Sequence, residues 1–150
     1  MLRLSKKADY ALMAARHLAL KTGPSSTSAR EIAEQYDIPI ELMAKVLQRL
    51  VRAGLLMSTQ GTRGGYTLSR SSESISVGDV IQAIDGPFTV TACSSEKIDC
   101  EQYSKCSIRD PLWQIRERIA VTLGTVTIAE MATESDAASV PVAHAEVIRR

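Results

Sequence analysis

Three cysteines within fourteen residues are the part of this sequence most able to do chemistry. Cys93, Cys100 and Cys106 are the only cysteines among the 150 residues, with the spacing C-x6-C-x5-C. A reducing cytoplasm disfavours disulfides, and an odd number leaves one thiol over. Structural zinc normally uses four ligands with a C-x2-C knuckle, which is absent here. The wide spacing favours an iron–sulfur cluster, with zinc and unliganded redox-active thiols as the alternatives.

A cluster of four irons needs a fourth ligand, which the neighbouring residues do not identify. Arg109 follows the last cysteine by three residues, but a guanidinium has no free lone pair. Acids in a polar loop are usually only solvated, and this loop contains Glu96, Asp99 and Glu101. Asp9 is a further candidate, although an acid in the first turn of a helix also interacts with the helix dipole.

The apolar spacing predicts three helices in the first half of the chain. The first follows Ser5, and Ser28 can cap the second, with Glu31 at the spacing of a capping box. The third runs over about 40–53 and stops at Gly54. The side chains expected on the apolar faces are Tyr10, Met13, Ala14, His17 and Leu18 in the first helix, and Met43, Val46, Leu47 and Leu50 in the third.

A glycine-rich hairpin is predicted after the third helix. Two short strands, over 55–59 and 66–68, flank a tip that runs from Gln60 to Gly65 and contains Arg63. A nucleotide-binding loop would need a P-loop lysine and a following helix, and both are missing. Two short helices followed by such a hairpin are the order of a winged helix-turn-helix. The sequence therefore predicts a mainly α fold with a small β-hairpin wing.

Charge is divided between the two parts of the chain. Residues 1–70 hold 11 Lys and Arg against 5 Asp and Glu, whereas residues 71–150 hold 7 against 12. A basic first half suggests that this half alone meets a polyanion. Together with the helix-turn-helix pattern, it predicts double-stranded DNA as a partner.

The second half is expected to form a sensor loop and a dimerisation helix. Ser76 can cap a short helix, and no periodicity follows over 88–107. A long helix over about 111–123 then has an apolar stripe that a small domain cannot cover, which favours a homodimer. That stripe contains Leu112, Ile115, Ile119 and Leu123. We predict a winged helix-turn-helix domain over 1–86, a cluster-binding loop and dimerisation helix over 87–133, and a flexible tail over 134–150.

Composition argues against several classes of protein. Apolar residues make up 45% and charged residues 23%, which is typical of globular chains. No apolar run approaches the roughly 20 residues needed to cross a bilayer, and Asp9, Arg16 and His17 interrupt a targeting peptide. We therefore expect a cytoplasmic protein without membrane contact. An enzyme is not expected, because C-x-x-C, a cofactor fingerprint and a paired acid and base are all missing.

Several segments of the chain are similar to the winged-helix transcription regulators typified by IscR and NsrR. They are Met1 to Lys6 with Asp9 to Ala11, Leu50 to Leu56, Gly61 to Tyr66, Ile75 to Ile81, and Thr127 to Met131. The resemblance covers about residues 1–133. Gly86-Pro87, the cysteine spacing and Trp113 most resemble the branch that regulates the SUF system of iron–sulfur assembly.

This resemblance implies a homodimeric bacterial transcription factor whose loop cysteines, Cys93, Cys100 and Cys106, hold an iron–sulfur cluster near the dimer interface. IscR-type members have a histidine ligand three residues after the last cysteine, where this chain has Arg109. NsrR-type members complete the set with an aspartate near the start of the first helix of the other subunit, which matches Asp9. We therefore expect Asp9 as the fourth ligand, with the cluster type open between [2Fe-2S] and [4Fe-4S].

The resemblance also implies a mode of DNA binding and a function. The third helix would enter the major groove, while the wing would touch the minor groove or the backbone. The expected DNA-contacting residues are Ser28, Glu41, Leu42, Ala44, Lys45, Gln60 and Arg63. The implied function is repression of iron–sulfur assembly genes in response to cluster, iron or redox status. The alternatives are a nitric oxide- or redox-responsive repressor of another regulon, and a thiol or electron-transfer protein.

Overall fold

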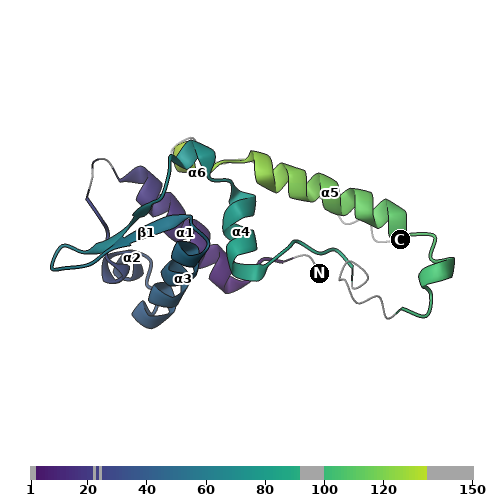
Figure 1. The fold of residues 1–150 in the computed structure, drawn as a ribbon, viewed down its shortest axis with the longest axis horizontal. Coiled ribbons are helices and arrows are strands. Elements are labelled where there is room, and N and C mark those ends of the chain that lie inside the picture. The colour runs from purple at the N-terminus through teal and green to yellow at the C-terminus, as the bar shows by residue number, and fades with distance from the viewer. Residues whose placement is uncertain (1–2, 22, 24, 92–99, 135–150) are drawn as a thin grey trace, which may run out of the picture.

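The computed structural model describes residues 3–21, 23, 25–91 and 100–134, and it has the mainly helical fold with one hairpin that the sequence predicts. The elements are α1 (Lys6–Leu20), α2 (Ala29–Gln35), α3 (Ile40–Arg52), β1 (Leu56–Thr59), β2 (Gly65–Leu68), η1 (Ser72–Ser74), α4 (Val77–Asp85), η3 (Tyr103–Lys105), α5 (Arg109–Thr125) and α6 (Ile128–Glu134). We call residues 3–86 with 126–134 the winged half, and residues 100–125 the arm. Figure 1 shows the arm extending away from the winged half.

Side-chain caps fix most helix starts in the winged half. The Ser5 hydroxyl accepts from Ala8 N at the start of α1, and the Ser28 hydroxyl accepts from Glu31 N at the start of α2. At α4, Ser76 and Asp79 form a complete capping box. Each cap satisfies a backbone N–H that the helix itself leaves unpaired.

The wing is an antiparallel hairpin held against the start of α2. Leu56 pairs with Leu68, and Thr27 exchanges two backbone hydrogen bonds with Tyr66, of 3.0 and 2.8 Å. A Cβ on Gly65 would lie 2.5 Å from the carbonyl oxygen of Thr27. A side chain at this position would therefore separate the wing from α2.

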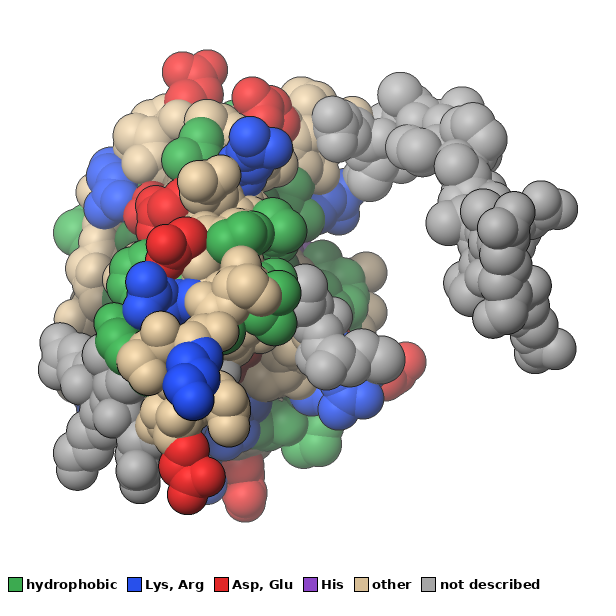
Figure 2. All heavy atoms as spheres, turned by 90° about the vertical axis from the view of Figure 1, so that its right-hand side faces the viewer, with side chains coloured by type: hydrophobic (Ala, Val, Ile, Leu, Met, Phe, Trp, Pro, Cys, Tyr) green, Lys and Arg blue, Asp and Glu red, His purple; other side chains and the backbone are tan. Residues whose placement is uncertain are grey.

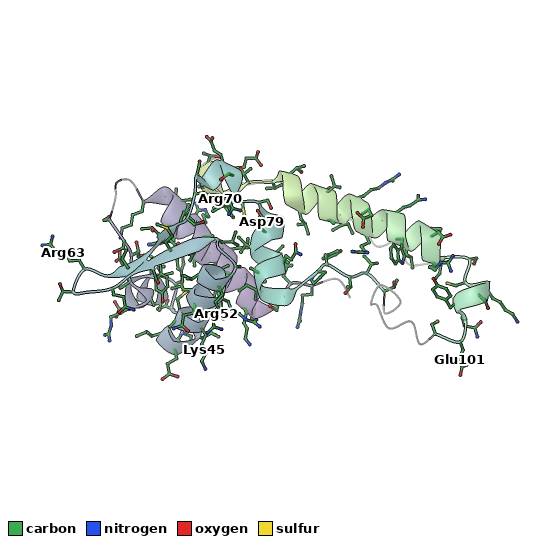
Figure 3. The ribbon with its side chains drawn as sticks, viewed as in Figure 1. Lys45, Arg52, Arg63, Arg70, Asp79 and Glu101 are labelled. Atoms are coloured by element: carbon green, nitrogen blue, oxygen red, sulfur yellow. The ribbon has the colours of Figure 1, made fainter. Side chains whose placement is uncertain are left out.

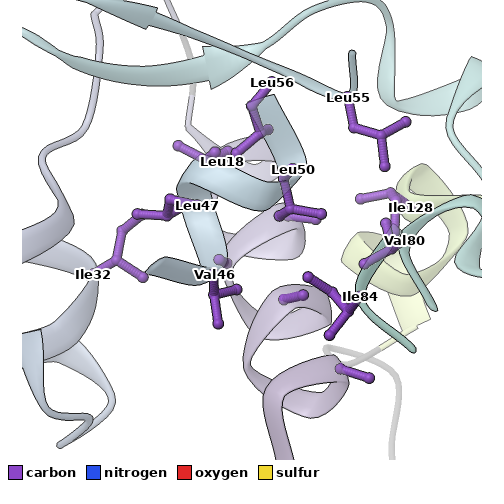
Figure 4. Close-up of a cluster of buried hydrophobic side chains, with 14 of the residues drawn as sticks. Leu18, Ile32, Val46, Leu47, Leu50, Leu55, Leu56, Val80, Ile84 and Ile128 are labelled. Carbon is purple, nitrogen blue, oxygen red and sulfur yellow. The ribbon is translucent and has the colours of Figure 1, made fainter. Parts of the chain in front are cut away.

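The core lies between α1, α3, α4 and the wing (Figure 4). All four apolar residues predicted to face inward on α3 are buried, and they are Met43, Val46, Leu47 and Leu50. The last helix also contributes, because Ile128 is fully buried and its N–H donates to the Ile75 carbonyl over 2.9 Å. Helix α6 thus returns from the arm and packs on the winged half.

Helix α1 buries Ala14 and Leu18 as predicted, and Tyr10 packs against the core, but Met13 departs from the predicted apolar face. Its buried residues are Ala8, Ala11, Ala14, Ala15 and Leu18, whereas Met13, expected inward, is 36% exposed. Small side chains let α4 and α6 approach the helix closely. The core-facing stripe is therefore mostly alanine, and Met13 faces outward.

Helix α5 is only partly covered in the single chain, where Leu123 at its base packs against the core. It begins two residues earlier than predicted, and none of its residues is buried. The large apolar side chains exposed in the arm are Tyr103 (38%), Ile108 (60%), Trp113 (43%), Ile115 (45%) and Val121 (62%). In the view from the arm's end, hydrophobic side chains lie at the surface among acidic and basic ones (Figure 2).

The base of α5 crosses α4 at two glycines. A Cβ on Gly78 would lie 3.2 Å from Gly124 N, so the two backbones are in close contact there. In the part of the chain that the structure describes, no helix is long and apolar enough to span a bilayer.

Candidate nucleic-acid interface and cysteine loop

Helix α3 presents a polar, mostly basic face to solvent. Glu41 and Lys45 are exposed, while Leu42 and Ala44 are half-buried beside them. The opposite face of the helix carries the core residues, so the helix is anchored on one side and free on the other. All four predicted contact residues of α3 therefore lie on or beside its accessible face.

The wing and α3 enclose a groove of about 490 Å³. Two predicted contact residues line it, Ser28 from the start of α2 and Gln60 from the wing. Arg63 is exposed at the wing tip, where its carbonyl oxygen accepts from the Ser26 hydroxyl over 2.8 Å. Figure 3 shows Arg63 extending from the tip and Glu101 at the opposite end of the molecule. Arg63 of the wing and Glu101 thus lie far apart.

Three further basic residues, which the sequence analysis did not single out, line the flank of α3: Arg49 and Arg52 of the helix itself and Lys7 of α1. A hollow of about 300 Å³ on its flank is lined by Lys7, Leu42, Lys45, Val46, Gln48, Arg49, Arg52 and Ile84. Lys45, Arg49 and Arg52 follow one another at four- and three-residue steps, the spacing of neighbours on one helix face. That spacing could have identified Arg49 and Arg52, whereas Lys7 reaches the hollow only through the packing of α1.

The end of α4 is tied to both α1 and α3. The Asp85 carboxylate accepts from the Ser5 hydroxyl over 2.5 Å and from Ser5 N over 3.1 Å. Arg49 Nη1 donates to the Ile84 carbonyl over 2.9 Å. Just beyond, Arg116 Nε of α5 donates to the Phe88 carbonyl over 3.1 Å. The chain that leads into the cysteine loop is thus attached to α1, α3 and α5.

Two of the three cysteines lie in the described part of the chain, and both are free thiols. Cys100 is exposed, Cys106 is half-buried, and Cys93 lies outside the described residues. Both described thiols are in the arm, before α5. Among the described residues, no group of three or more His, Cys, Asp or Glu side chains is gathered that could hold a metal ion.

Asp9 lies in the other part of the molecule. It is half-buried in the first turn of α1, and η3, next to the cysteines, lies at the far end of α5 in Figure 1. A single chain therefore does not bring Asp9 to Cys100 and Cys106.

Arg109 is the first residue of α5 and lies beside Cys106 in the sequence. Its Cζ lies 4.7 Å from the centre of the Tyr103 ring, and its Nε donates to Asp110 over 2.8 Å. The Asp110 hydrogen bond and charge raise the pKa of Arg109, with smaller contributions from Tyr103 and Cys106. The same hydrogen bond lowers the pKa of the Asp110 carboxyl.

A three-helix core, a hairpin wing and an exposed basic helix define a winged-helix DNA-binding protein. Residues 4–134 match the family model of Rrf2, described as an iron-dependent transcriptional regulator. The chain belongs to the Rrf2 family. Because its relatives are transcriptional regulators, it is a regulator and not an enzyme.

Relatives of known name match most of the chain. The HTH-type transcriptional regulator IscR of Yersinia pestis is 31% identical over 136 residues, 90% of this chain and 82% of the relative. IscR of Vibrio parahaemolyticus is 30% identical over 90% of this chain and 80% of its own.

Solved structures of similar fold support the same family. CymR, the global cysteine regulator of B. subtilis, matches with a TM-score of 0.72 and 29% identity over 88% of this chain and 97% of its own. IscR of T. potens matches with a TM-score of 0.69 and 27% identity over 92% and 93%. The resemblance to winged-helix regulators of the IscR type is thereby confirmed.

Proposed function

We propose that this protein is a homodimeric repressor of iron–sulfur assembly genes that senses cluster, iron or redox status through an iron–sulfur cluster. The observation that carries the proposal is the location of free cysteines in an arm whose helix leaves large apolar side chains exposed in the single chain. The winged half would bind operator DNA, and the arm would bind the cluster and the second subunit.

A second copy of the chain is the natural cover for α5. The exposed apolar side chains Trp113, Ile115 and Val121 would otherwise remain in water along one helix. Two copies related by a twofold axis can pair such helices through the same surface on each. The homodimer would also place two α3 helices at a fixed spacing, as a palindromic operator requires.

The donor set fits an iron–sulfur cluster. Thiolates are the usual ligands of such clusters, and the two described thiols are free and accessible to solvent. Cys93, Cys100 and Cys106 would each supply a sulfur, and Asp9 of the second subunit the fourth ligand. When bound, a cluster supplies a centre that oxidants, nitric oxide or iron starvation can remove.

The contacts at the end of α4 support communication between the loop and the DNA-binding surface. Arg49 of α3 and Arg116 of α5 hold the carbonyls of Ile84 and Phe88, on either side of Gly86 and Pro87. A change in the cysteine loop would therefore act on the same short segment that fixes α3. A regulator with two conformations changes from one to the other when the cluster stabilises one of them by a few kcal/mol more than the other.

The test is purification of the full chain without oxygen, with analysis of iron, sulfide and visible absorption. We expect brown protein that binds duplexes selected from a random-sequence pool, with affinity that changes when the cluster is removed. Cys106→Ser should abolish the absorption, whereas the neighbouring Ser107→Ala should retain it. Asp9→Ala should shorten the cluster lifetime while the dimer persists.

Three other results would contradict or change the proposed function. Colourless wild-type protein with stoichiometric zinc and unchanged DNA binding would contradict cluster sensing. DNA affinity that responds to thiol oxidation in cluster-free protein would favour the redox-responsive alternative. An Asp9→Ala variant with an unchanged spectrum and cluster lifetime would remove Asp9 from the ligand set.

A further inference from the structure

The segment from Cys100 to the start of α5 is held together by contacts of Tyr103 and Arg109. Tyr103 N donates to the carbonyl of Cys100 over 3.0 Å, so η3 begins on a hydrogen bond to the first described cysteine. Arg109 Nη1 donates to the Tyr103 carbonyl over 3.5 Å, and its guanidinium stacks on the Tyr103 ring. Tyr103 is therefore linked to Cys100 on one side and to α5 on the other.

Cys106 lies inside this closed segment. It follows η3 directly and precedes Arg109 by three residues, and it is half-buried, whereas Cys100 is exposed. The start of α5 has no side-chain cap, because Ile108 occupies the N-cap position. The contacts of Arg109 with the carbonyl and ring of Tyr103 thus fasten this end of the helix to the loop.

We propose that Arg109 is a positioning residue for the cluster: it holds the turn from Tyr103 to α5 around Cys106 and places a positive charge in the same short segment as that cysteine. This inference rests on the proposed function. Arg109 itself cannot be a ligand, because its guanidinium has no lone pair to donate.

Two physical effects follow from this geometry. A loop that is already ordered loses less conformational entropy when it binds a group, so the cluster should be held longer. A cluster held by thiolates becomes more negative on reduction, and a nearby positive charge stabilises that form. Arg109 should therefore extend the cluster lifetime and raise its reduction potential.

The two effects can be separated by three variants of the full chain. Arg109→Gln removes the positive charge and weakens the stacking on the Tyr103 ring. Arg109→Lys keeps the positive charge without the planar guanidinium. Tyr103→Leu keeps the arginine but removes the ring on which it stacks. Arg118→Gln is the matched control, since Arg118 is an exposed arginine on the same helix.

The first measurement uses reduced, metal-free protein. Amide hydrogen exchange of the peptide spanning residues 103–109 should be severalfold faster in Arg109→Gln, Arg109→Lys and Tyr103→Leu than in wild type or Arg118→Gln. Equal exchange in all five proteins would overturn the proposal.

The second measurement uses protein reconstituted with iron and sulfide. The cluster should be lost to a chelator severalfold faster in all three variants, whereas the reduction potential should fall only in Arg109→Gln. If wild type holds a cluster and Arg109→Gln matches it in lifetime and potential, only this inference fails. If wild type takes up no cluster, the proposed function fails and the inference falls with it.

Discussion

In the winged half, Met43, Leu47 and Leu50 are fully buried by their own chain, whereas Trp113, Ile115 and Val121 of the arm keep 43 to 62% of their surface exposed. Both regions are helical and both have apolar residues at regular spacing. The winged half buries its apolar face against its own helices and needs no other component. The arm instead leaves large apolar side chains exposed that its own chain does not cover.

The first test of this contrast is removal of a core side chain. Leu47→Ala should lower the free energy of unfolding by about 2–5 kcal/mol, because it leaves a cavity in a close-packed core. Urea denaturation followed by circular dichroism measures this. The matched change Leu20→Ala, at a residue 47% exposed, should cost less than about 0.5 kcal/mol. Equal losses would mean that Leu47 is not held in a close-packed core of the winged half.

A charge on the arm should separate subunits without unfolding them. Ile115→Asp places a carboxylate on the face proposed to pair, and burying an unpaired charge typically costs several kcal/mol. Sedimentation should then show a monomer with an unchanged helical spectrum. Gln114→Asp carries the same charge one residue away and should remain a dimer. A dimeric Ile115→Asp variant would place the interface elsewhere.

The wing tip should contribute to DNA affinity mainly through charge. Arg63→Ala should weaken binding to all duplexes alike and reduce the slope of log affinity against log salt by about 0.9, the value for one phosphate contact. Fluorescence anisotropy at several salt concentrations measures the slope. Arg118→Ala, an exposed arginine of the arm, should leave it unchanged. An unaltered slope in Arg63→Ala would remove the wing tip from the interface.

Protonation of His17 should have the smallest effect. Burial is the main cause that lowers its pKa, and Nδ1 lies 3.2 Å from the Tyr36 hydroxyl. The folded state therefore favours neutral His17, so stability is present above the unfolded pKa of about 6.5 and declines as the pH falls through it. His17→Phe should flatten the pH dependence of the melting temperature between pH 7.5 and 5.5, whereas His144→Gln should not.

The helices of the winged half could be predicted from the sequence, because the residues that begin and end each helix lie next to it in the chain. Ser5, Ser28 and Ser76 cap the helices they precede, and Gly54, with a φ of 75°, ends α3 as predicted. Met13 is the exception. Its size suggested burial, but the core accepts the smaller side chains of Ala11 and Ala15 and leaves Met13 outside. Periodicity identifies a helix, whereas which side chains fit depends on the neighbouring helices.

The candidate site residues divide in the same way between those that could be predicted and those that could not. The accessible face of α3 and the wing tip could be predicted, because both depend on residues close in sequence. Lys7 could not, since it joins Arg52 beside α3 only through the packing of α1. The proposed approach of Asp9 to Cys106 could not be predicted from a single chain, because Asp9 lies in α1 of the winged half and Cys106 follows η3 in the arm.

Because Gly78 has no side chain, the backbones of α4 and α5 cross in close contact at Gly124, and α5 extends away from the winged half from this crossing. At 1.5 Å per residue, its 17 residues extend about 25 Å from that crossing. A methyl group at Gly78 would push the crossing apart by a few tenths of an ångström, and the tilt would be magnified at the far tip. The absence of a side chain at Gly78 thus sets the direction in which the whole helix leaves the winged half.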